Sequence, residues 1–429
     1  MRIASGRRLK GTCSVPGDKS ISHRAALIAA LAEGVSTVEN FSTAADCAAT
    51  LSCLSALGVV VEKDGTMVRI NGTKLHQPHE PLNCGNSGST MRMMAGLLAA
   101  EKFECTLAGD ASLSARPMNR IVEPLEMMGA RFRSDNGCPP LTIHGSDRLS
   151  AIEYQLPVPS AQVKTALLLA GLRAHGRTVI TEAVRTRDHT ERMLKWFGVL
   201  VETEDGPGSA VTAINRGARV TGAKLKIPGD FSSAAYFIAA AAMLPGSEIE
   251  VGNVGLNPTR TQFIDVLRSF GADIETADIR DECNEPVGTI RVRGRTLQHG
   301  PSNVIEGELS AALIDELPLL GVVGTQVPGG LTVKDAGELR VKETDRIGAT
   351  VKNLRAMGAT IEEFADGFSI PGPVRLDGAT IQTYGDHRIA MAFSVAALLA
   401  HGESEINGAA SVAVSFPDFF ARLESLLER

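Results

Sequence analysis

Residues 16–34 read PGDKSISHRAALIAALAEG, and residues 228–246 read PGDFSSAAYFIAAAAMLPG. Both stretches begin with Pro-Gly-Asp and continue into an Ala-rich apolar run that ends at a second glycine. An acid just before an apolar run is typical of a helix N-cap, and a glycine after the run is typical of the helix C-terminus. We therefore predict a helix after each Pro-Gly-Asp, and the match between two distant stretches indicates an internal repeat.

Four further stretches share the pattern of a polar turn and an Ala- and Leu-rich helix, and they start at Cys84, Val158, Ile314 and Tyr384. A second pattern predicts an amphipathic helix, a C-terminal glycine and a strand. Its copies are LSALGVVVE, LEMMGARFR, LKWFGVLVE, LRSFGADIE and LRAMGATIE. The sixth copy, FARLESLLER at the end of the chain, lacks the glycine. The sequence thus predicts six mixed units of helix and strand.

The two Pro-Gly-Asp segments divide the chain into two lobes. Three of the repeated units lie between these segments, so we expect residues 18–227 to form one lobe. This lobe would be inserted into another that comprises residues 1–17 and 228–429. A length of 429 residues also exceeds what one hydrophobic core usually serves.

Composition and charge narrow the class of function. A net charge of -6 argues against a general nucleic-acid-binding protein. The seven cysteines are scattered without a CxxC pair, which supports neither a disulfide framework nor a cysteine zinc site. The N-terminus lacks the apolar core of a secretory signal, and no stretch of about twenty apolar residues predicts a membrane span. We therefore expect a cytoplasmic protein without a membrane partner.

Residues 17–24 are similar to a phosphate-binding loop, but not to that of a nucleotide hydrolase. The glycine spacing is one residue too long, and Asp18 stands beside Lys19, where an acid would oppose a triphosphate. An ordinary helix start, with Asp18 or Ser20 as the N-cap, is the alternative. Because Lys19 and Arg24 gather at that helix end, we interpret it as an anion site.

Cations also gather at other expected helix starts or in the loops beside them, and the whole set is Lys19, Arg24, Arg92, Arg116, Arg187, Lys342, Arg346 and Arg388. We expect Lys342 and Arg346 to share one helix face at i and i+4. For that segment, the alternative is a salt bridge between Glu343 and Arg346 on a solvated surface. For the loop that contains Arg116, the favoured interpretation is a solvated arginine just before a helix that begins at Pro117. Together the cations indicate a site for a small, highly charged ligand, since arginine binds phosphate and carboxylate bidentately.

Other polar residues at these helix starts are less specific. Ser160, Gln162 and Lys164 offer hydroxyl, amide and ammonium groups ahead of an apolar helix, and capping explains the first of them. Asp315 lies in an apolar segment, where a carboxylate needs ionic partners or a shifted pKa. A buried structural role is the usual alternative for a lone histidine such as His387.

Ten segments, in this order, resemble the 5-enolpyruvylshikimate-3-phosphate synthase family of enolpyruvyl transferases over nearly the full length: PGDKSISHR, CGNSGSTMR, GDASLSARPM, SAQVK, RDHTERML, NPTRT, IDELP, ELRVKETDRI, GDHRIAMAF and SFPDFF. The resemblance implies a two-lobed, inside-out α/β barrel of six βαβαββ repeats, three in each lobe, with the active site in the cleft between the lobes. It implies a monomeric 3-phosphoshikimate 1-carboxyvinyltransferase of chorismate and aromatic amino acid biosynthesis. Such an enzyme transfers the enolpyruvyl group of phosphoenolpyruvate to the 5-hydroxyl of shikimate 3-phosphate, releases phosphate and needs no cofactor or metal.

The resemblance also implies roles for single residues. Shikimate 3-phosphate would be bound by Lys19, Ser20, Arg24, Ser160, Ala161, Gln162, Arg187, Asp315 and Lys342. Phosphoenolpyruvate would be bound by Lys19, Asn86, Gly88, Arg92, Arg116, Gln162, Lys342, Arg346, His387 and Arg388. Asp315 would take the hydroxyl proton, Glu343 would protonate C3 and later remove that proton, and Lys19 would aid proton transfer or stabilise charge.

The sequence departs from the family pattern in places. Residues 412–415 offer no lysine near SFPDFF, where some members carry one, and Ala161 stands where some members have serine. Gly88 occupies a position where glyphosate-tolerant members can have alanine, so we expect a glyphosate-sensitive enzyme. One alternative is a UDP-N-acetylglucosamine enolpyruvyl transferase, but the loop GDASLSARP lacks the cysteine usual in that family. The other is a non-catalytic phosphate-sugar binding protein, against which the acids Asp315 and Glu343 argue.

Overall fold

The computed structural model describes residues 1–6, 8–206 and 209–428. The chain forms two compact units, each with its own hydrophobic core. Unit 1 comprises Met1–Pro16, Pro228–Arg280 and Pro286–Arg429. Unit 2 comprises Gly17–Ile227 and the short segment Asp281–Glu285. The chain therefore leaves unit 1 after Pro16 and returns to it after Ile227.

The described part of unit 2 contains three four-stranded sheets. Its strands are β3 (Val35–Glu39), β4 (Val60–Asp64), β5 (Met67–Asn71), β6 (Leu82–Asn83), β7 (Glu104–Ala108), β8 (Arg131–Asp135), β9 (Cys138–His144), β10 (Glu153–Leu156), β11 (Arg177–Glu182), β12 (Val201–Gly206), β13 (Ser209–Asn215) and β14 (Lys224–Lys226). Its helices are α1 (Lys19–Leu31), α2 (Ala45–Ala56), α3 (Gly88–Ala99), α4 (Ala111–Ser114), α5 (Asn119–Met127), α6 (Ala161–Gly171) and α7 (His189–Trp196). The strand orders are β14-β3-β5-β4, β6-β7-β9-β8 and β10-β11-β13-β12.

The described part of unit 1 also contains three sheets. Its strands are β1 (Arg2–Ala4), β2 (Lys10–Ser14), β15 (Glu248–Gly255), β16 (Asp273–Glu282), β17 (Glu285–Arg293), β18 (Val304–Ile305), β19 (Leu331–Val333), β20 (Glu362–Phe364), β21 (Gly367–Ile370), β22 (Thr380–Gln382) and β23 (Glu403–Asn407). Its helices are α8 (Phe231–Met243), α9 (Gln262–Ser269), α10 (Gly307–Ala312), α11 (Leu317–Gly324), α12 (Arg346–Ala356), α13 (His387–Leu399) and α14 (Phe419–Leu426), with 3-10 helices η1 (Gly337–Val341) and η2 (Ala409–Val414). The strand orders are β16-β17-β15-β2, β18-β19-β21-β20 and β1-β23-β22.

The sheets of unit 2 share one topology. In each, two parallel strands are followed by an antiparallel hairpin, as in β6 with β7 and then β9 with β8. A parallel pair needs a crossover, and a helix such as α3 supplies it. The strand that completes the first sheet, β14, comes from the far end of the inserted segment and pairs with β3. The predicted two-lobed α/β fold with repeated βαβαββ units is confirmed.

The sixth repeat differs from the others in its strands. It contributes β22, α13 and β23, and then α14, which holds most of FARLESLLER; Arg429 lies outside the described residues. The place of a hairpin strand is taken by β1 from the N-terminus, which pairs antiparallel to β23 with Arg2 opposite Glu405.

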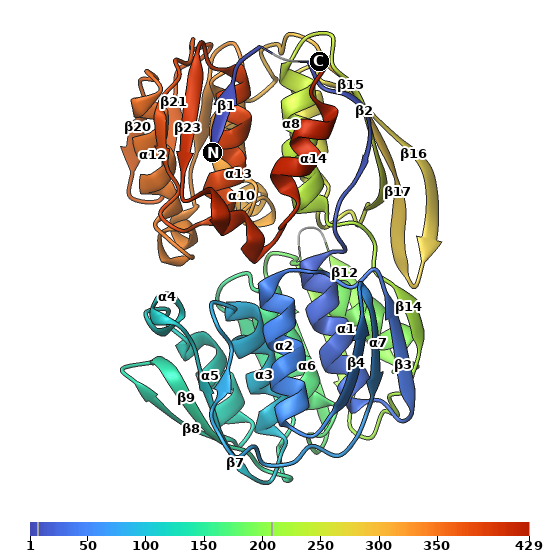
Figure 1. Ribbon diagram of the computed structural model, residues 1–429. Helices are drawn as coiled ribbons and strands as arrows, with labels where there is room; N and C mark the ends of the chain where they lie inside the picture. The colour runs from blue at the N-terminus through green and yellow to red at the C-terminus, as the bar shows by residue number, and fades with distance from the viewer. Residues whose placement is uncertain (7, 207–208, 429) are drawn as a thin grey trace. The chain divides into compact units, whose positions relative to one another are not determined.

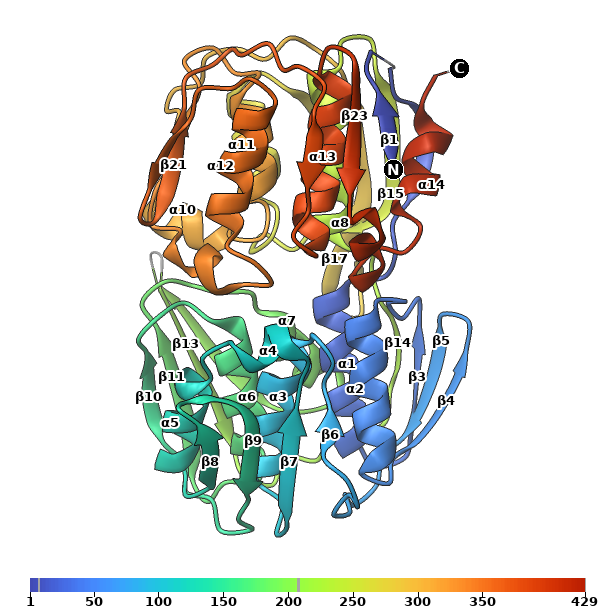
Figure 2. The same ribbon diagram turned by 60° about the vertical axis from the view of Figure 1, so that its left-hand side comes forward.

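The Ala- and Leu-rich helix of each repeat (α1, α3, α6, α8, α11 and α13) is buried nearly all round. Every residue of α8 is buried, and in α3 only Ser89 is not. A helix that is apolar on all faces belongs in a core, and small side chains let several such helices approach one another. Figures 1 and 2 show the sheets of unit 2 arranged around α1, α3 and α6. This arrangement explains the Ala-rich runs that the sequence repeats.

Glycines fix two features of this packing. The five glycines of the second sequence pattern all have positive φ angles, which confirms the predicted helix ends; they are Gly58, Gly129, Gly198, Gly271 and Gly358. At Gly96 of α3, an added Cβ would lie 2.1 Å from the carbonyl oxygen of Ala166 in α6. Only glycine allows the two backbones to approach this closely, and Arg92, one turn earlier in α3, reaches Gln162 of α6 as a result.

No helix in the described ranges is both long and apolar enough to cross a membrane. The seven cysteines are free thiols.

Candidate active site

In unit 2 the predicted anion site lies at the first turn of α1. Of the two N-cap candidates, Asp18 is the N-cap, and its side chain accepts a hydrogen bond from the Ile21 amide at 2.8 Å. Lys19 begins the helix, and its ammonium lies 2.9 Å from Oδ2 of Asp46, a buried residue of α2. Arg24, one turn later, is only 3% exposed. The sequence did not single out Asp46, because its partner is 27 residues away and its own neighbours form an ordinary helix start.

The start of α3 carries a second group of predicted residues. Arg116 Nη2 donates to Oδ1 of Asn86 at 2.6 Å, and Asn86 Nδ2 donates to Asp110 at 2.8 Å. Both guanidiniums of this group face Gly88, since a Cβ there would lie 2.8 Å from Arg92 Nη1 and 3.4 Å from Arg116 Nη1. The structure therefore brings Asn86, Gly88, Arg92 and Arg116 together.

The loop of Arg116 corrects two sequence-based interpretations. Arg116 is 6% exposed, so the favoured interpretation of a solvated side chain is wrong. The helix expected at Pro117 begins at Asn119, and a short helix, α4, precedes Arg116. Asp110 caps α4 by accepting a bond from Leu113, so the loop turns back toward Asn86.

The first turn of α6 joins the same group. Ser160 is the N-cap and accepts a bond from the Val163 amide at 3.4 Å. Gln162 accepts from Arg92 Nη1 at 2.9 Å through Oε1 and donates to Ser89 Oγ at 2.8 Å through Nε2. Gln162 thus links the starts of α3 and α6, and the geometry fixes its amide orientation.

Lys164 does not join the polar groups with which the sequence placed it. Its ammonium lies 2.7 Å from both Glu182 and Glu191, and all three side chains are buried. Burial by itself lowers the pKa of Lys164, but the two carboxylates outweigh that effect and raise it. Lys164 is therefore a buried structural cation.

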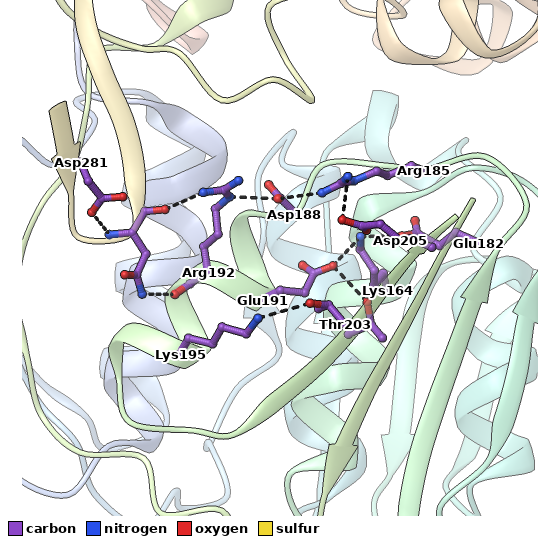
Figure 3. A pocket seen from close by; sticks show the side chains of 13 residues that line it. Lys164, Glu182, Arg185, Asp188, Glu191, Arg192, Lys195, Thr203, Asp205 and Asp281 are labelled. Carbon is purple, nitrogen blue, oxygen red and sulfur yellow. Dashed lines mark hydrogen bonds and ion pairs between the residues drawn. The ribbon is translucent and has the colours of Figure 1, made fainter. Parts of the chain in front are cut away.

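A cavity of about 490 Å³ lies beside this cluster (Figure 3). Its charged walls are paired: Asp188 bonds to Arg192 at 2.9 Å and to Arg185 at 3.3 Å, so it does not cap α7 with its side chain. The described residues that line the cavity include none of those predicted to bind substrate. Arg187 lies half-buried in the loop that leads into α7.

In unit 1 the predicted residues lie at the N-termini of α11, α12 and α13. Arg346, the first residue of α12, is 1% exposed and contacts three carboxylates. Its Nη2 donates to Glu343 at 2.6 Å, its Nε donates to Asp386 at 2.7 Å, and its Nη1 lies 3.8 Å from Asp315. Burial alone lowers the pKa of the guanidinium, but Asp386 and Glu343 outweigh it and raise the pKa. The Glu343–Arg346 ion pair of the alternative interpretation exists, but Arg346 is buried and does not lie on a solvated surface.

Asp315 also has the partners that its apolar setting requires. Arg388 Nη2 lies 3.4 Å from its carboxylate, and Arg388 Nη1 donates to its carbonyl oxygen at 3.0 Å. Asp386 is the N-cap of α13 and accepts a bond from the Arg388 amide at 2.8 Å. His387 is buried at the first position of that helix.

The expected shared helix face of Lys342 and Arg346 is wrong. Asp345 caps α12 by accepting a bond from the Gly348 amide at 3.0 Å, so the helix begins at Arg346. Lys342 directly follows the 3-10 helix η1, and its ammonium donates to Glu338 at 2.7 Å. Burial lowers the pKa of Lys342, and the carboxylates of Glu338 and Asp315 offset only part of that effect.

Known proteins that are similar to this chain in sequence or in structure include several enolpyruvyl transferases. The chain matches the family model described as EPSP synthase (3-phosphoshikimate 1-carboxyvinyltransferase) over residues 3–423. A 3-phosphoshikimate 1-carboxyvinyltransferase from Solibacter usitatus is 49% identical over 100% of this chain and 99% of its own, and one from Koribacter versatilis is 48% identical with the same coverage. EPSP synthase from Acinetobacter baumannii superimposes with a TM-score of 0.85 at 39% identity, covering 99% of this chain and 97% of that one. The enolpyruvyl transferase NikO from Streptomyces tendae shares the fold, with a TM-score of 0.80 at 18% identity over 100% and 97% of the two chains.

The family model and these relatives place the chain, with its two units of repeated α/β sheets, among the enolpyruvyl transferases. The chain belongs to the EPSP synthase family. The expected activity, transfer of the enolpyruvyl group from phosphoenolpyruvate to shikimate 3-phosphate in aromatic biosynthesis, is confirmed.

Proposed function

We propose that the two clusters divide the binding and the chemistry of this reaction. In unit 2, Lys19, Ser20, Arg24, Ser160, Ala161, Gln162 and Arg187 bind shikimate 3-phosphate, and Asn86, Gly88, Arg92, Arg116 and Gln162 bind phosphoenolpyruvate. In unit 1, Lys342 and Asp315 contact shikimate 3-phosphate, and Lys342, Arg346, His387 and Arg388 contact phosphoenolpyruvate. Lys19 serves both substrates. The packing of two guanidiniums against Gly88 supports the phosphoenolpyruvate assignment, because that ligand carries a phosphate and a carboxylate.

One observation carries the assignment of the acid–base groups. Asp315 and Glu343 both contact the guanidinium of Arg346, at 3.8 Å and 2.6 Å. Two carboxylates on one fixed cation are held close together, as two proton transfers on one small substrate require. A buried arginine stays protonated, so it favours the carboxylate form of each partner after a proton has been given up.

The proposed steps follow from these positions. Asp315 takes the proton of the 5-hydroxyl as that oxygen attacks C2 of phosphoenolpyruvate, and Glu343 in its acid form donates a proton to C3. The resulting tetrahedral intermediate collapses when Glu343 takes a proton back from C3, and the C2–O bond to phosphate breaks. The departing phosphate receives the proton that Asp315 took from the hydroxyl, which returns Asp315 to its carboxylate form. The arginines and Lys19 stabilise the charge of the departing phosphate, which is a large contribution when the donors are preorganised.

This division requires that residues of both units act on one bound pair of substrates. We therefore propose that substrate binding draws the units into a closed state that excludes water. Small-angle scattering of the full chain tests this: shikimate 3-phosphate with glyphosate should reduce the radius of gyration. An unchanged radius would contradict the closure.

A coupled phosphate-release assay tests the residue roles. Asp315→Asn should lower kcat by about 10²–10⁴-fold. Asp265→Asn is the matched control, because Asp265 is an exposed acid of the same unit whose side chain is 73% exposed. If the kcat of Asp315→Asn equals the wild-type value, Asp315 is not the group that takes the hydroxyl proton. UDP-N-acetylglucosamine serves as the negative control substrate.

We further propose a monomeric, cytoplasmic enzyme, as the family resemblance implies. Light scattering coupled to size-exclusion chromatography should give the mass of one chain, 45.2 kDa. Twice that mass would contradict the monomer.

A further inference from the structure

Three helices of unit 2 meet at the guanidinium of Arg24. Its Nε donates to Oγ1 of Thr190 in α7 at 2.7 Å, its Nη1 donates to the carbonyl oxygen of Ser20 at 2.9 Å, and its Nη2 donates to the carbonyl oxygen of Ala161 at 3.3 Å. Each nitrogen therefore has an acceptor on a different helix start: α1, α6 or α7. Arg24 and Thr190 are both buried.

A second threonine completes this arrangement. Thr165 Oγ1 donates to the carbonyl oxygen of Ala161 at 2.6 Å and lies 2.6 Å from Thr190 Oγ1. A hydroxyl has one proton to donate. Because the proton of Thr165 goes to Ala161, the Thr190 hydroxyl donates to Thr165 and accepts from Arg24. The result is a closed ring in which the direction of every hydrogen bond is fixed.

We propose that Thr190, supported by Thr165, is a positioning residue that orients the guanidinium of Arg24 toward the phosphate-sugar substrate. The inference rests on the proposed role of Arg24 in binding shikimate 3-phosphate. Neither threonine belongs to the proposed binding residues, and both act through Arg24. A hydrogen bond from a charged donor is stronger than a neutral one, so the Thr190 hydroxyl constrains the plane of the guanidinium effectively.

A separate contact keeps the two helices together without the hydroxyls. Lys164 and Glu191, the chain neighbours of Thr165 and Thr190, form a buried ion pair at 2.7 Å between α6 and α7 (Figure 3). If one hydroxyl is lost, the Lys164–Glu191 ion pair therefore still holds α6 against α7. We expect a Thr190 variant to fold and to lose orientation of Arg24 rather than the packing of the helices.

The test compares three variants in the full chain. Thr190→Val keeps the shape but removes the acceptor of Arg24 Nε, and Thr190→Ser keeps the hydroxyl. Thr178→Val is the matched control, since Thr178 is a buried threonine of β11 whose Oγ1 has no hydrogen-bond partner among the described residues. Calorimetric titration measures the Kd of shikimate 3-phosphate, steady-state kinetics give kcat and both KM values, and thermal unfolding gives the Tm.

Thr190→Val should raise the Kd and KM for shikimate 3-phosphate about tenfold, the factor expected when a buried charged donor loses one acceptor. Its kcat at saturation and its KM for phosphoenolpyruvate should stay within about threefold, because the proposed acid–base groups are untouched. Thr190→Ser should restore the affinity, and Thr178→Val should leave it unchanged. Affinity in Thr190→Val equal to that of the wild type, or equal loss in Thr178→Val, overturns the proposal.

Two further variants separate the possible failures. Arg24→Gln should weaken binding of shikimate 3-phosphate more than Thr190→Val does. If Arg24→Gln has no effect, the proposed role of Arg24 fails; if it weakens binding while Thr190→Val does not, only the positioning role of Thr190 fails. Should Thr190→Val not fold, Thr165→Val decides the question. It removes the acceptor of the Thr190 hydroxyl and should raise the Kd about threefold, whereas an unchanged Kd overturns the proposal.

Discussion

Arg346, the first residue of α12 in unit 1, donates a hydrogen bond from Nη2 to Oε2 of Glu343 at 2.6 Å. The pair has the i,i+3 spacing of a common surface salt bridge, and such bridges contribute little to stability. Here the arginine is 1% exposed and also binds Asp386, so its position is fixed from two sides. Glu343 is therefore held by a partner that cannot swing away, which suits a group that exchanges a proton with substrate.

Glu343→Gln should lower kcat by about 10²–10⁴-fold. Glutamine keeps the size of the side chain and can still accept from Arg346, but it cannot carry the proton that C3 of phosphoenolpyruvate exchanges. The affinity for shikimate 3-phosphate, measured by calorimetry, should stay near the wild-type value. A large loss of that affinity would make Glu343 a binding residue instead. Glu362→Gln, an exposed position on β20 of the same unit, is the control.

Gly88→Ala should weaken inhibition by glyphosate more than it raises KM for phosphoenolpyruvate. The new methyl would lie 2.8 Å from Arg92 Nη1, so the tip of that flexible side chain must shift, and an inhibitor longer than phosphoenolpyruvate tolerates less space. Inhibition constants and KM values of both proteins check this. Gly252→Ala, at a glycine with no atom within 4 Å of an added Cβ, should change neither value. Full retention of inhibition in Gly88→Ala would remove the steric argument.

Local patterns in the sequence predicted the six units, the two lobes and the cations at the helix starts, whereas the βαβαββ topology and the residue roles were implied by the family resemblance. The helix starts, the C-terminal glycines and the six repeats depend on neighbours within one turn, as with Asp18 and its bond to the Ile21 amide. The start of α12 differs from the prediction. The cations Lys342 and Arg346 suggested one helix that contains both, but Asp345 is the N-cap and the helix begins at Arg346. The partners Asp46 and Thr190 could not be predicted, since packing of distant helices brings them to Lys19 and Arg24.

His23 makes the stability of unit 2 depend on pH. Burial, with Lys19 and Arg24 nearby, holds the pKa of His23 well below its usual 6.5, although Asp18 acts in the opposite direction. Below about pH 6.5 the unfolded chain binds a proton that the folded chain does not, so stability falls by up to about 1.4 kcal/mol per pH unit until the folded pKa is reached. Above about pH 6.5, His23 is neutral in both the folded and the unfolded chain, and stability no longer depends on its protonation.

The difference between wild type and His23→Gln isolates this contribution, because the other titrating groups cancel. Unfolding of unit 2 can be followed through Trp196, the one tryptophan of the chain, which lies in α7. The glutamine variant should be less stable near pH 7.5, since His23 Nδ1 contacts Thr50 at 2.7 Å, and the gap should narrow toward about pH 5.5. A gap that stays constant over this range would contradict a neutral, buried His23.

Lys164→Met should destabilise unit 2 by about 3–5 kcal/mol, because it leaves the carboxylates of Glu182 and Glu191 buried without their shared cation. Urea unfolding followed through Trp196 measures the loss. Lys195→Met is the control: this lysine lies on α7 and bonds only weakly, at 3.3 Å, to Thr203, so its change should stay within about 0.5 kcal/mol. Adding Glu182→Gln and Glu191→Gln to Lys164→Met should recover most of the stability, since neutral amides need no counter-ion. If the triple variant is no more stable than Lys164→Met, then lost packing rather than unpaired charge causes the loss.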